Sequence, residues 1–394
     1  DAQRSSRAQG GLPEKLRERW RVQAANVRAD DLDSDRRWSE RHLGALSAPV
    51  IGAGLVLVAA PETHEVLAFG ADTGDRRWAF SAGGKVDSPP TLACGLAVFG
   101  CDDGAVYALR ASDGQLVWRF CAAPTDGVAM HHGHLASAFP VPGSVLVLGD
   151  AVVAVAGHHT DLGGLHVWVL DLATGTPRAG RAVRDDQPAV VANGVAVADS
   201  GGAGFWIGQQ LHLGLDLKDL PAGREAPGPP VWFDRSGTRL RFRTNDARGG
   251  STHEWKGAAR LGRHAGHRLA RDGRVAYVMR DPTDRDRHPV RADQIALVAA
   301  VTGTEPKAKE LWSASVKSLG SRESYGALIK AGDHLVLGGG ARDGSTGFVQ
   351  VLDAKSGTLL ATLDLRSRVT ECGLATAEGR LYVCCEDGTL VCLE

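Results

Sequence analysis

Five histidines in two neighbouring segments are the residues whose type and spacing could do chemistry. Imidazole nitrogens are common ligands of Zn²⁺ and similar metals, so a divalent metal site is one hypothesis. Its candidate ligands are His131, His134 and His159, with His132 and His158 beside them. No acidic residue or cysteine stands at the usual ligand spacing, and histidines in solvated loops explain the same pattern.

The seven cysteines offer a second source of chemistry. Cys384 and Cys385 are adjacent, and the chain has no CxxC or CxxCH motif. Neighbouring side chains on a strand point to opposite faces of the sheet, so a bond between these two would need a distorted peptide. We therefore expect buried free thiols rather than a disulfide framework.

Other motifs are incomplete. The segment 31–35 (DLDSD) resembles the start of a calcium-binding EF-hand loop, but Arg36 replaces the required Gly and His42 the bidentate Glu. No Gly-Lys-Ser/Thr follows the glycines at 338–340, and no G-x-S-x-G is present. The sequence therefore predicts no catalytic residue.

The amino-acid composition limits the classes of partner that the chain could bind. The 45 basic and 46 acidic residues balance, which argues against a nucleic-acid groove or an anionic membrane surface. No run of about 18 apolar residues is present, so no transmembrane segment is predicted.

A repeat of 40 residues defines the elements that must position these side chains. Residues 66–80 (VLAFGADTGDRRWAF) align without gaps with 106–120 (VYALRASDGQLVWRF), matching Gly74 with Gly114 and Trp78 with Trp118. Each copy follows another hairpin, so each repeat holds four short strands, A to D. This period is typical of β-propeller blades.

Weaker copies extend the repeat to the C-terminus, where the last one stops after strand C. Residues 15–22 carry Trp20 and resemble a lone strand D, which we expect to complete that last blade. The predicted fold is an all-β propeller of eight four-stranded blades, with seven as the alternative because residues 199–265 are irregular. The predicted domains are an N-terminal extension with the closing strand, 1–46, and one propeller, 47–394.

The strand C to D unit resembles the tryptophan-docking motif of the PQQ-like (quinoprotein-like) propeller family, roughly A-x-D-x-x-T-G-x-x-x-W. The chain looks related to bacterial outer-membrane assembly lipoproteins, and closer to uncharacterised PQQ-like propellers with segments such as 83–91 (GGKVDSPPT). The resemblance implies that each tryptophan stacks on the next blade while the Asp and Thr fix the turn. The implied docking residues are Trp20, Trp78, Trp118 and Trp312.

Quinoprotein dehydrogenases resemble this fold and use a vicinal disulfide, an Asp base and Ca²⁺. Here the adjacent cysteines fall in the final blade rather than an early one, so the resemblance does not carry the cofactor over. No cofactor is predicted, and PQQ or a divalent metal remains the alternative.

Loop lengths predict which face is used. The A–B and C–D turns are tight, whereas the long segments 121–143, 157–165, 281–293, 315–325 and 341–347 are B–C or D–A connections on the other face. Long loops on a rigid scaffold usually carry binding groups. The candidate binding residues on this face are Lys85, Asp87, His131, His132, His158, Arg322 and Glu323.

The complete blades without a catalytic set favour a non-catalytic scaffold that binds a protein or polymer. The alternatives are a quinone- or metal-dependent oxidoreductase and a structural subunit of a larger assembly. A chain that begins at Asp1 is expected after removal of a leader, and equally from trimming of a longer chain. An extracytoplasmic location, periplasmic or envelope-associated, is favoured, with the cytoplasm as the alternative because of the free thiols.

Overall fold

The structure is a computed structural model that describes two compact units of β-strands. Described are residues 7–8, 11–12, 16–26, 45–131, 134–157, 163–183, 324–341 and 344–394 and, between 195 and 315, only the strands β17 to β28. The first unit holds residues 3–26 and 231–394, and the second holds residues 27–230. Within the described residues there is one 3-10 turn, η2 (Pro61–Thr63), and no α-helix. The described part of the chain is therefore all-β, as predicted.

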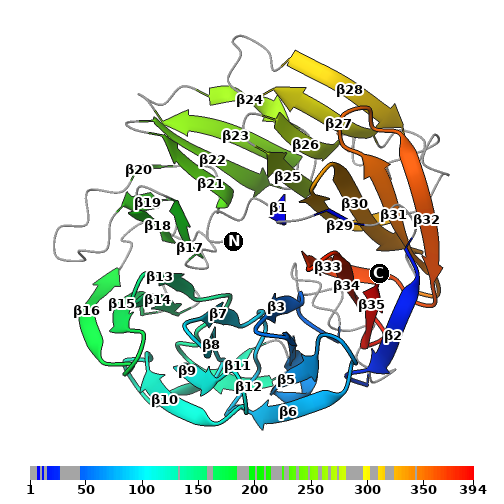
Figure 1. Cartoon of the computed structure of the whole chain (residues 1–394). Helices are drawn as coiled ribbons and strands as arrows, with labels where there is room; N and C mark the ends of the chain where they lie inside the picture. Colours follow the sequence, from blue (N-terminus) through cyan, green and yellow to red (C-terminus); the bar gives the residue numbers. More distant parts are fainter. Residues whose placement is uncertain are drawn as a thin grey trace. The chain divides into compact units, whose positions relative to one another are not determined.

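The second unit contains four four-stranded sheets, each with its strands in chain order, and one separate hairpin (Figure 1). The sheets are β3 (Val50–Gly52), β4 (Leu55–Ala60), β5 (Glu65–Gly70), β6 (Arg76–Ser81); β7 (Thr91–Ala93), β8 (Leu96–Gly100), β9 (Ala105–Arg110), β10 (Leu116–Cys121); β13 (Leu146–Leu148), β14 (Ala151–Ala156), β15 (Leu165–Asp171), β16 (Pro177–Val183); and β17 (Val195–Asp199), β18 (Gly202–Ile207), β19 (Gln210–Leu213), β20 (Arg224–Glu225). The hairpin is β11 (Val128–His131) with β12 (His134–Ser137).

The first unit contains four sheets of the same meander type (Figure 1). They are β21 (Pro230–Ser236), β22 (Arg239–Asp246), β23 (Gly249–Trp255), β24 (Arg260–His264); β25 (Arg268–Asp272), β26 (Val275–Arg280), β27 (Ala296–Val301), β28 (Lys309–Ser315); β29 (Ser324–Ala331), β30 (His334–Gly340), β31 (Gly347–Asp353), β32 (Leu359–Leu365), with β1 (Arg7–Ala8) added parallel to β29; and β33 (Val369–Ala377), β34 (Arg380–Cys385), β35 (Thr389–Leu393), β2 (Glu18–Gln23). Four-stranded meanders of this kind are typical of β-propeller blades.

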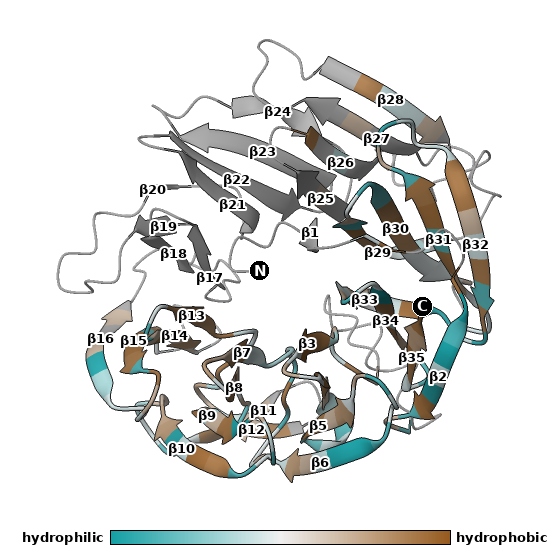
Figure 2. Cartoon of the chain, viewed as in Figure 1, coloured by the Kyte–Doolittle hydropathy of each residue, from teal (hydrophilic) through white to brown (hydrophobic). Residues whose placement is uncertain are grey.

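Burial explains why the second strands β4 and β14 are apolar at every position. All six residues of β4 and all six of β14 are buried, so both faces of these strands pack against neighbours. The fourth strands differ, since β6 and β10 each bury their central Trp and expose most other positions. Figure 2 shows the contrast between brown β14 and the teal residues of β6 and β2.

The predicted pairing of the N-terminal strand with the C-terminal strand is confirmed. β2 runs antiparallel to β35, with Trp20 opposite Cys392 and Val22 opposite Leu390. Arg17 N also donates to Glu394 O at 2.7 Å, and Glu394 N donates back to Arg17 O at 2.9 Å. The last sheet is therefore completed by residues from both ends of the chain.

One segment differs from the sequence expectation. The segment 121–143 is not a simple loop, because it contains the β11–β12 hairpin. The region 199–265, where the sequence repeat is irregular, contains strands β18 to β24, which belong to two four-stranded sheets. Blade number, ring closure and the domain boundaries stay predictions.

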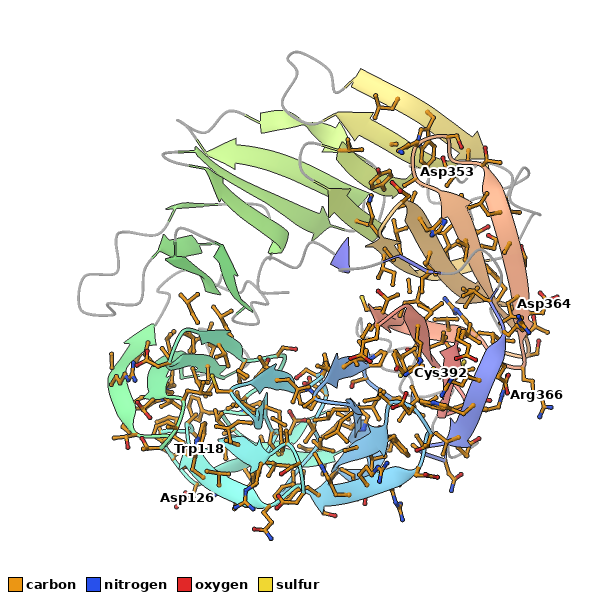
Figure 3. All side chains as sticks on the ribbon, in the orientation of Figure 1. Trp118, Asp126, Asp353, Asp364, Arg366 and Cys392 are labelled. Atoms are coloured by element: carbon orange, nitrogen blue, oxygen red, sulfur yellow. The ribbon has the colours of Figure 1, made fainter. Side chains whose placement is uncertain are left out.

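Three tryptophans make the same contact with the sheet that follows their own. Each indole Nε1 donates a hydrogen bond to a carbonyl three residues before a turn glycine of positive φ. The sets are Trp78 with Ala111 O (2.9 Å) and Gly114, Trp118 (Figure 3) with Leu172 O (2.9 Å) and Gly175, and Trp312 with Ala354 O (3.0 Å) and Gly357. The same indole-to-carbonyl hydrogen bond therefore links each of these three sheets to the sheet that follows it.

Carboxylates fix two of the turns that the tryptophans contact. Asp171 Oδ1 accepts hydrogen bonds from the backbone N and the hydroxyl of Thr174, both at 2.9 Å. Asp353 and Ser356 repeat the arrangement at 2.7 Å. The hydrogen bonds from Arg178 and Thr174 lower the pKa of Asp171 to about 2. The Asp of the repeat thus stabilises its own turn by accepting hydrogen bonds from the turn residues.

Candidate functional site

The B–C and D–A connections of the second unit lie at one end of its sheets, which we call the crossover face. It consists of residues 61–64, 82–90, 101–104 and 122–145. Asp102 N donates to Lys85 O at 2.9 Å, and Ser137 N donates to Asp102 O at 2.8 Å. Gly143 N donates to the Asp87 carboxylate at 3.0 Å. The connections of three successive sheets are therefore joined into one surface.

Lys85 and Asp87 are the predicted binding residues that the structure describes fully. Lys85 Nζ lies 2.8 Å from the Glu62 carboxylate in η2, and its side chain is 17% exposed. Asp87 anchors Gly143, as given above. Both side chains therefore hold connections of the crossover face in place, whatever else they contact.

The other predicted binding and metal-ligating residues have side chains that the structure does not describe. His131 and His134 occupy directly opposed positions of β11 and β12. Their side chains lie outside the described part of the chain, as do His132, His158, His159, Arg322 and Glu323. The histidine metal site thus stays a prediction.

A polar network that sequence reasoning missed lies at the crossover face. Tyr107 OH donates to Asp103 Oδ2 at 2.5 Å, and the Arg119 guanidinium donates to both, at 3.0 Å each. Asp103 Oδ1 also accepts from Ala105 N at 3.0 Å. The guanidinium carbon lies 5.4 Å from the centre of the Tyr107 ring, within cation–π range. Charge and hydrogen bonding therefore hold the three side chains as a unit.

The network shifts the ionisation of its members. Burial raises the pKa of Asp103, but hydrogen bonds from Tyr107, Cys101 and Arg119 outweigh it and hold that pKa below its usual value. Burial and the bond to Asp103 raise the pKa of Tyr107 to about 12. The network is thus a carboxylate, a neutral phenol and a guanidinium at neutral pH, which suits structure better than proton transfer.

Close packing explains the glycines that precede Lys85. A Cβ on Gly83 would lie 2.5 Å from Asp103 Oδ2, and one on Gly84 would lie 2.8 Å from Asp103 N. The backbone of the crossover therefore passes directly over the Asp103 turn. Asp387 repeats this turn in the last sheet, where its carboxylate accepts from Thr389 N at 3.0 Å.

The described residues do not fit a quinone and metal centre. Cys384 and Cys385 are free thiols, fully buried within β34, and burial raises the pKa of both. No group of three or more His, Cys, Asp or Glu able to hold a metal occurs among the described residues. The other cysteines are also outside any disulfide: Cys101 and Cys392 are buried, and Cys94, Cys121 and Cys372 are exposed.

Comparison with known families decides the relationship. A family model described as outer membrane protein assembly factor BamB matches residues 17–206. The resemblance to the PQQ-like propeller family is confirmed. The match begins in the β2 segment and includes the crossover face and the Asp103 network.

Two curated relatives carry the same name. The protein of Moranella endobia is 32% identical over 88 residues, which is 21% of this chain and 22% of the relative. The protein of Nitrosomonas eutropha is 26% identical over 138 residues, 33% of each. The chain therefore spans about a third or less of the length of the curated relatives it matches.

Solved structures support the fold. The quinohemoprotein alcohol dehydrogenase of Comamonas testosteroni superposes with a TM-score of 0.65 at 13% identity, covering 100% of this chain and 79% of that one. A computationally designed protein, Ika8, gives 0.56 at 17% identity, covering 90% and 97%. At such identities the likeness concerns architecture and carries no chemistry. Among the described residues, no helix is long and apolar enough to cross a membrane.

Proposed function

We propose that this PQQ-like chain is a non-catalytic module that binds a partner protein through its crossover face. The match of residues 17–206 to a model described as an outer membrane protein assembly factor carries the proposal. The joined connections of the crossover face support it, because a rigid surface loses little conformational entropy on binding. A protein is favoured over a polymer as the partner, since the curated relatives are named for protein assembly.

The same relationship supports an extracytoplasmic location. The name of the relatives refers to the outer membrane, and we propose that this chain works in that envelope compartment. The partner would then be a protein of outer-membrane assembly.

We test this function by tagging the chain in cells that express it, cross-linking, and quantifying what copurifies by mass spectrometry. Asp126→Arg changes an exposed residue of the crossover face (Figure 3), and Asp75→Arg is the matched control at an exposed position of a C–D turn. We expect a specific protein whose recovery falls at least tenfold with Asp126→Arg and less than twofold with Asp75→Arg. If the control variant reduces recovery of the partner more than Asp126→Arg does, the binding site lies on the face of the C–D turns. A quinone absorbance spectrum in the purified chain would instead support an oxidoreductase.

We further propose that the four-stranded sheets are eight blades of one ring, formed by residues 47–394 and closed by the strand of residues 1–46. In this proposal Trp20 has the role that Trp78, Trp118 and Trp312 have at their sheets. Its support is the repeated pattern of indole, carbonyl and turn glycine, and the pairing of β2 with β35.

Replacing Trp20 by Phe is then expected to lower the free energy of unfolding by about 1–2 kcal/mol, as each other Trp→Phe change should. Phe fills most of the same volume but leaves a buried carbonyl without its donor. Urea titration of the four variants provides the comparison. If Trp20→Phe leaves the midpoint at the wild-type value while Trp118→Phe lowers it, Trp20 has no docking role and closure by this strand is contradicted.

A further inference from the structure

The β11–β12 hairpin projects apolar side chains from the crossover face. Val128, Met130 and Leu135 are 64%, 71% and 69% exposed, more than the other large apolar residues with described side chains. Val128 and Met130 alternate along β11, and Met130 is directly opposite Leu135, so the three share one face of the hairpin. An exposed face of this kind marks an interaction site.

The hairpin also offers an unpaired edge. Among the described strands, β11 and β12 pair with each other and with no third strand. Residues 127–130 are exposed at every position, whereas Ala136 and Ser137 of β12 are buried, and Ser137 N is bonded to Asp102 O. β12 thus fixes the hairpin to the crossover face and leaves β11 as the outer strand.

Charge distinguishes β11 from the outer strands of the sheets. The fourth strands β2, β6, β10, β16, β20, β24, β28 and β32 each carry at least one Arg, Lys, Asp or Glu. Charged side chains on an edge strand normally prevent pairing with another chain. Residues 127–143 contain no Arg, Lys, Asp or Glu. β11 therefore lacks the protection that the other outer strands have.

We propose that β11 is the docking edge for an extended, uncharged segment of the partner protein, which adds a strand to the hairpin. This inference rests on the proposed function and specifies where and how that partner binds. Main-chain hydrogen bonds to β11 supply affinity, and apolar residues at alternate positions of the segment cover Val128 and Met130. The exposed apolar side chains of Val128 and Met130 favour an uncharged segment, because a charge buried against them would lose its hydration.

The test uses the full chain and an amidated peptide that alternates Val and Thr over eight residues and carries fluorescein on its N-terminal amine. Fluorescence anisotropy is expected to show binding that weakens at least tenfold when Met130 is replaced by Asp. Leu116→Asp is the matched control, since Leu116 is 49% exposed on charged strand β10, and it should change binding less than twofold. Hydrogen exchange should show slower exchange of amides in residues 127–137 when peptide is bound.

The inference would be overturned by no binding at millimolar peptide, by equal binding to Met130→Asp, or by a peptide with Asp in place of Val binding as well as the original. Sedimentation that shows a concentration-dependent dimer, lost with Met130→Asp, would make a second copy the occupant and also overturn it. The proposed function is judged separately, because a partner recovered equally by wild type and Met130→Asp would leave it standing while this inference fails.

Discussion

Replacing Gly114 by Ala is expected to lower the free energy of unfolding by about 2–4 kcal/mol. Gly114 has a φ of +73°, where a side chain costs about 1–2 kcal/mol. The added Cβ would also lie 2.6 Å from Cδ2 of Trp78, and overpacking of this kind costs about 1–3 kcal/mol. The Trp78 ring cannot shift without weakening its hydrogen bond to Ala111 O. The midpoint of urea unfolding, followed by tryptophan fluorescence, measures the effect.

Gly95→Ala provides the matched control. Gly95 has a φ of +77°, and a Cβ there would meet nothing within 4 Å. Its replacement should therefore cost only the backbone contribution, about 1–2 kcal/mol. An equal loss of stability in the two variants would show that Trp78 is not held against the turn of Gly114. Gly175 and Gly357, which contact Trp118 and Trp312, should behave like Gly114.

The tryptophan contacts show what a repeat in the sequence can predict. Aligning Trp78 with Trp118 and Gly74 with Gly114 was enough to expect four-stranded units, because strand and turn patterns are local. The pairing of β2 with β35 also followed, since a repeat that lacks its fourth strand leaves an unpaired edge. The offset of three residues between acceptor carbonyl and turn glycine needed the structure, because Ala111, Leu172 and Ala354 have little in common as side chains.

The candidate site was less predictable for two physical reasons. Asp103, Tyr107 and Arg119 come from a turn and two strands, and only the three-dimensional register brings them together. One signal was present, since Asp-Gly precedes the third strand at both 103–104 and 387–388. The β11–β12 hairpin was missed because its alternation covers few residues and is interrupted by histidines, so it resembled a loop.

Replacing Asp103 by Asn is expected to lower the free energy of unfolding by about 2 kcal/mol at pH 7. The change keeps the shape of the side chain but removes the charge that accepts hydrogen bonds from Tyr107 and Arg119. Hydrogen bonds to charged groups are each worth about 1.5–3 kcal/mol, and the partly exposed Arg119 reduces the total. Urea titration at a series of pH values measures the difference between variant and wild type.

The pH dependence identifies the charge as the cause. The pKa of Asp103 is lower in the folded chain than its value of about 4 in an unfolded one. The ionised carboxylate therefore stabilises the fold above about pH 4, and this contribution is lost as the pH falls through the folded-state pKa. The difference in free energy of unfolding between wild type and Asp103→Asn should thus become smaller below pH 4. Asp126→Asn, at an exposed position, should have almost the same free energy of unfolding as wild type at any pH. A difference for Asp103→Asn that stays constant from pH 7 to pH 2 would mean that the loss of stability does not come from the ionisation of Asp103.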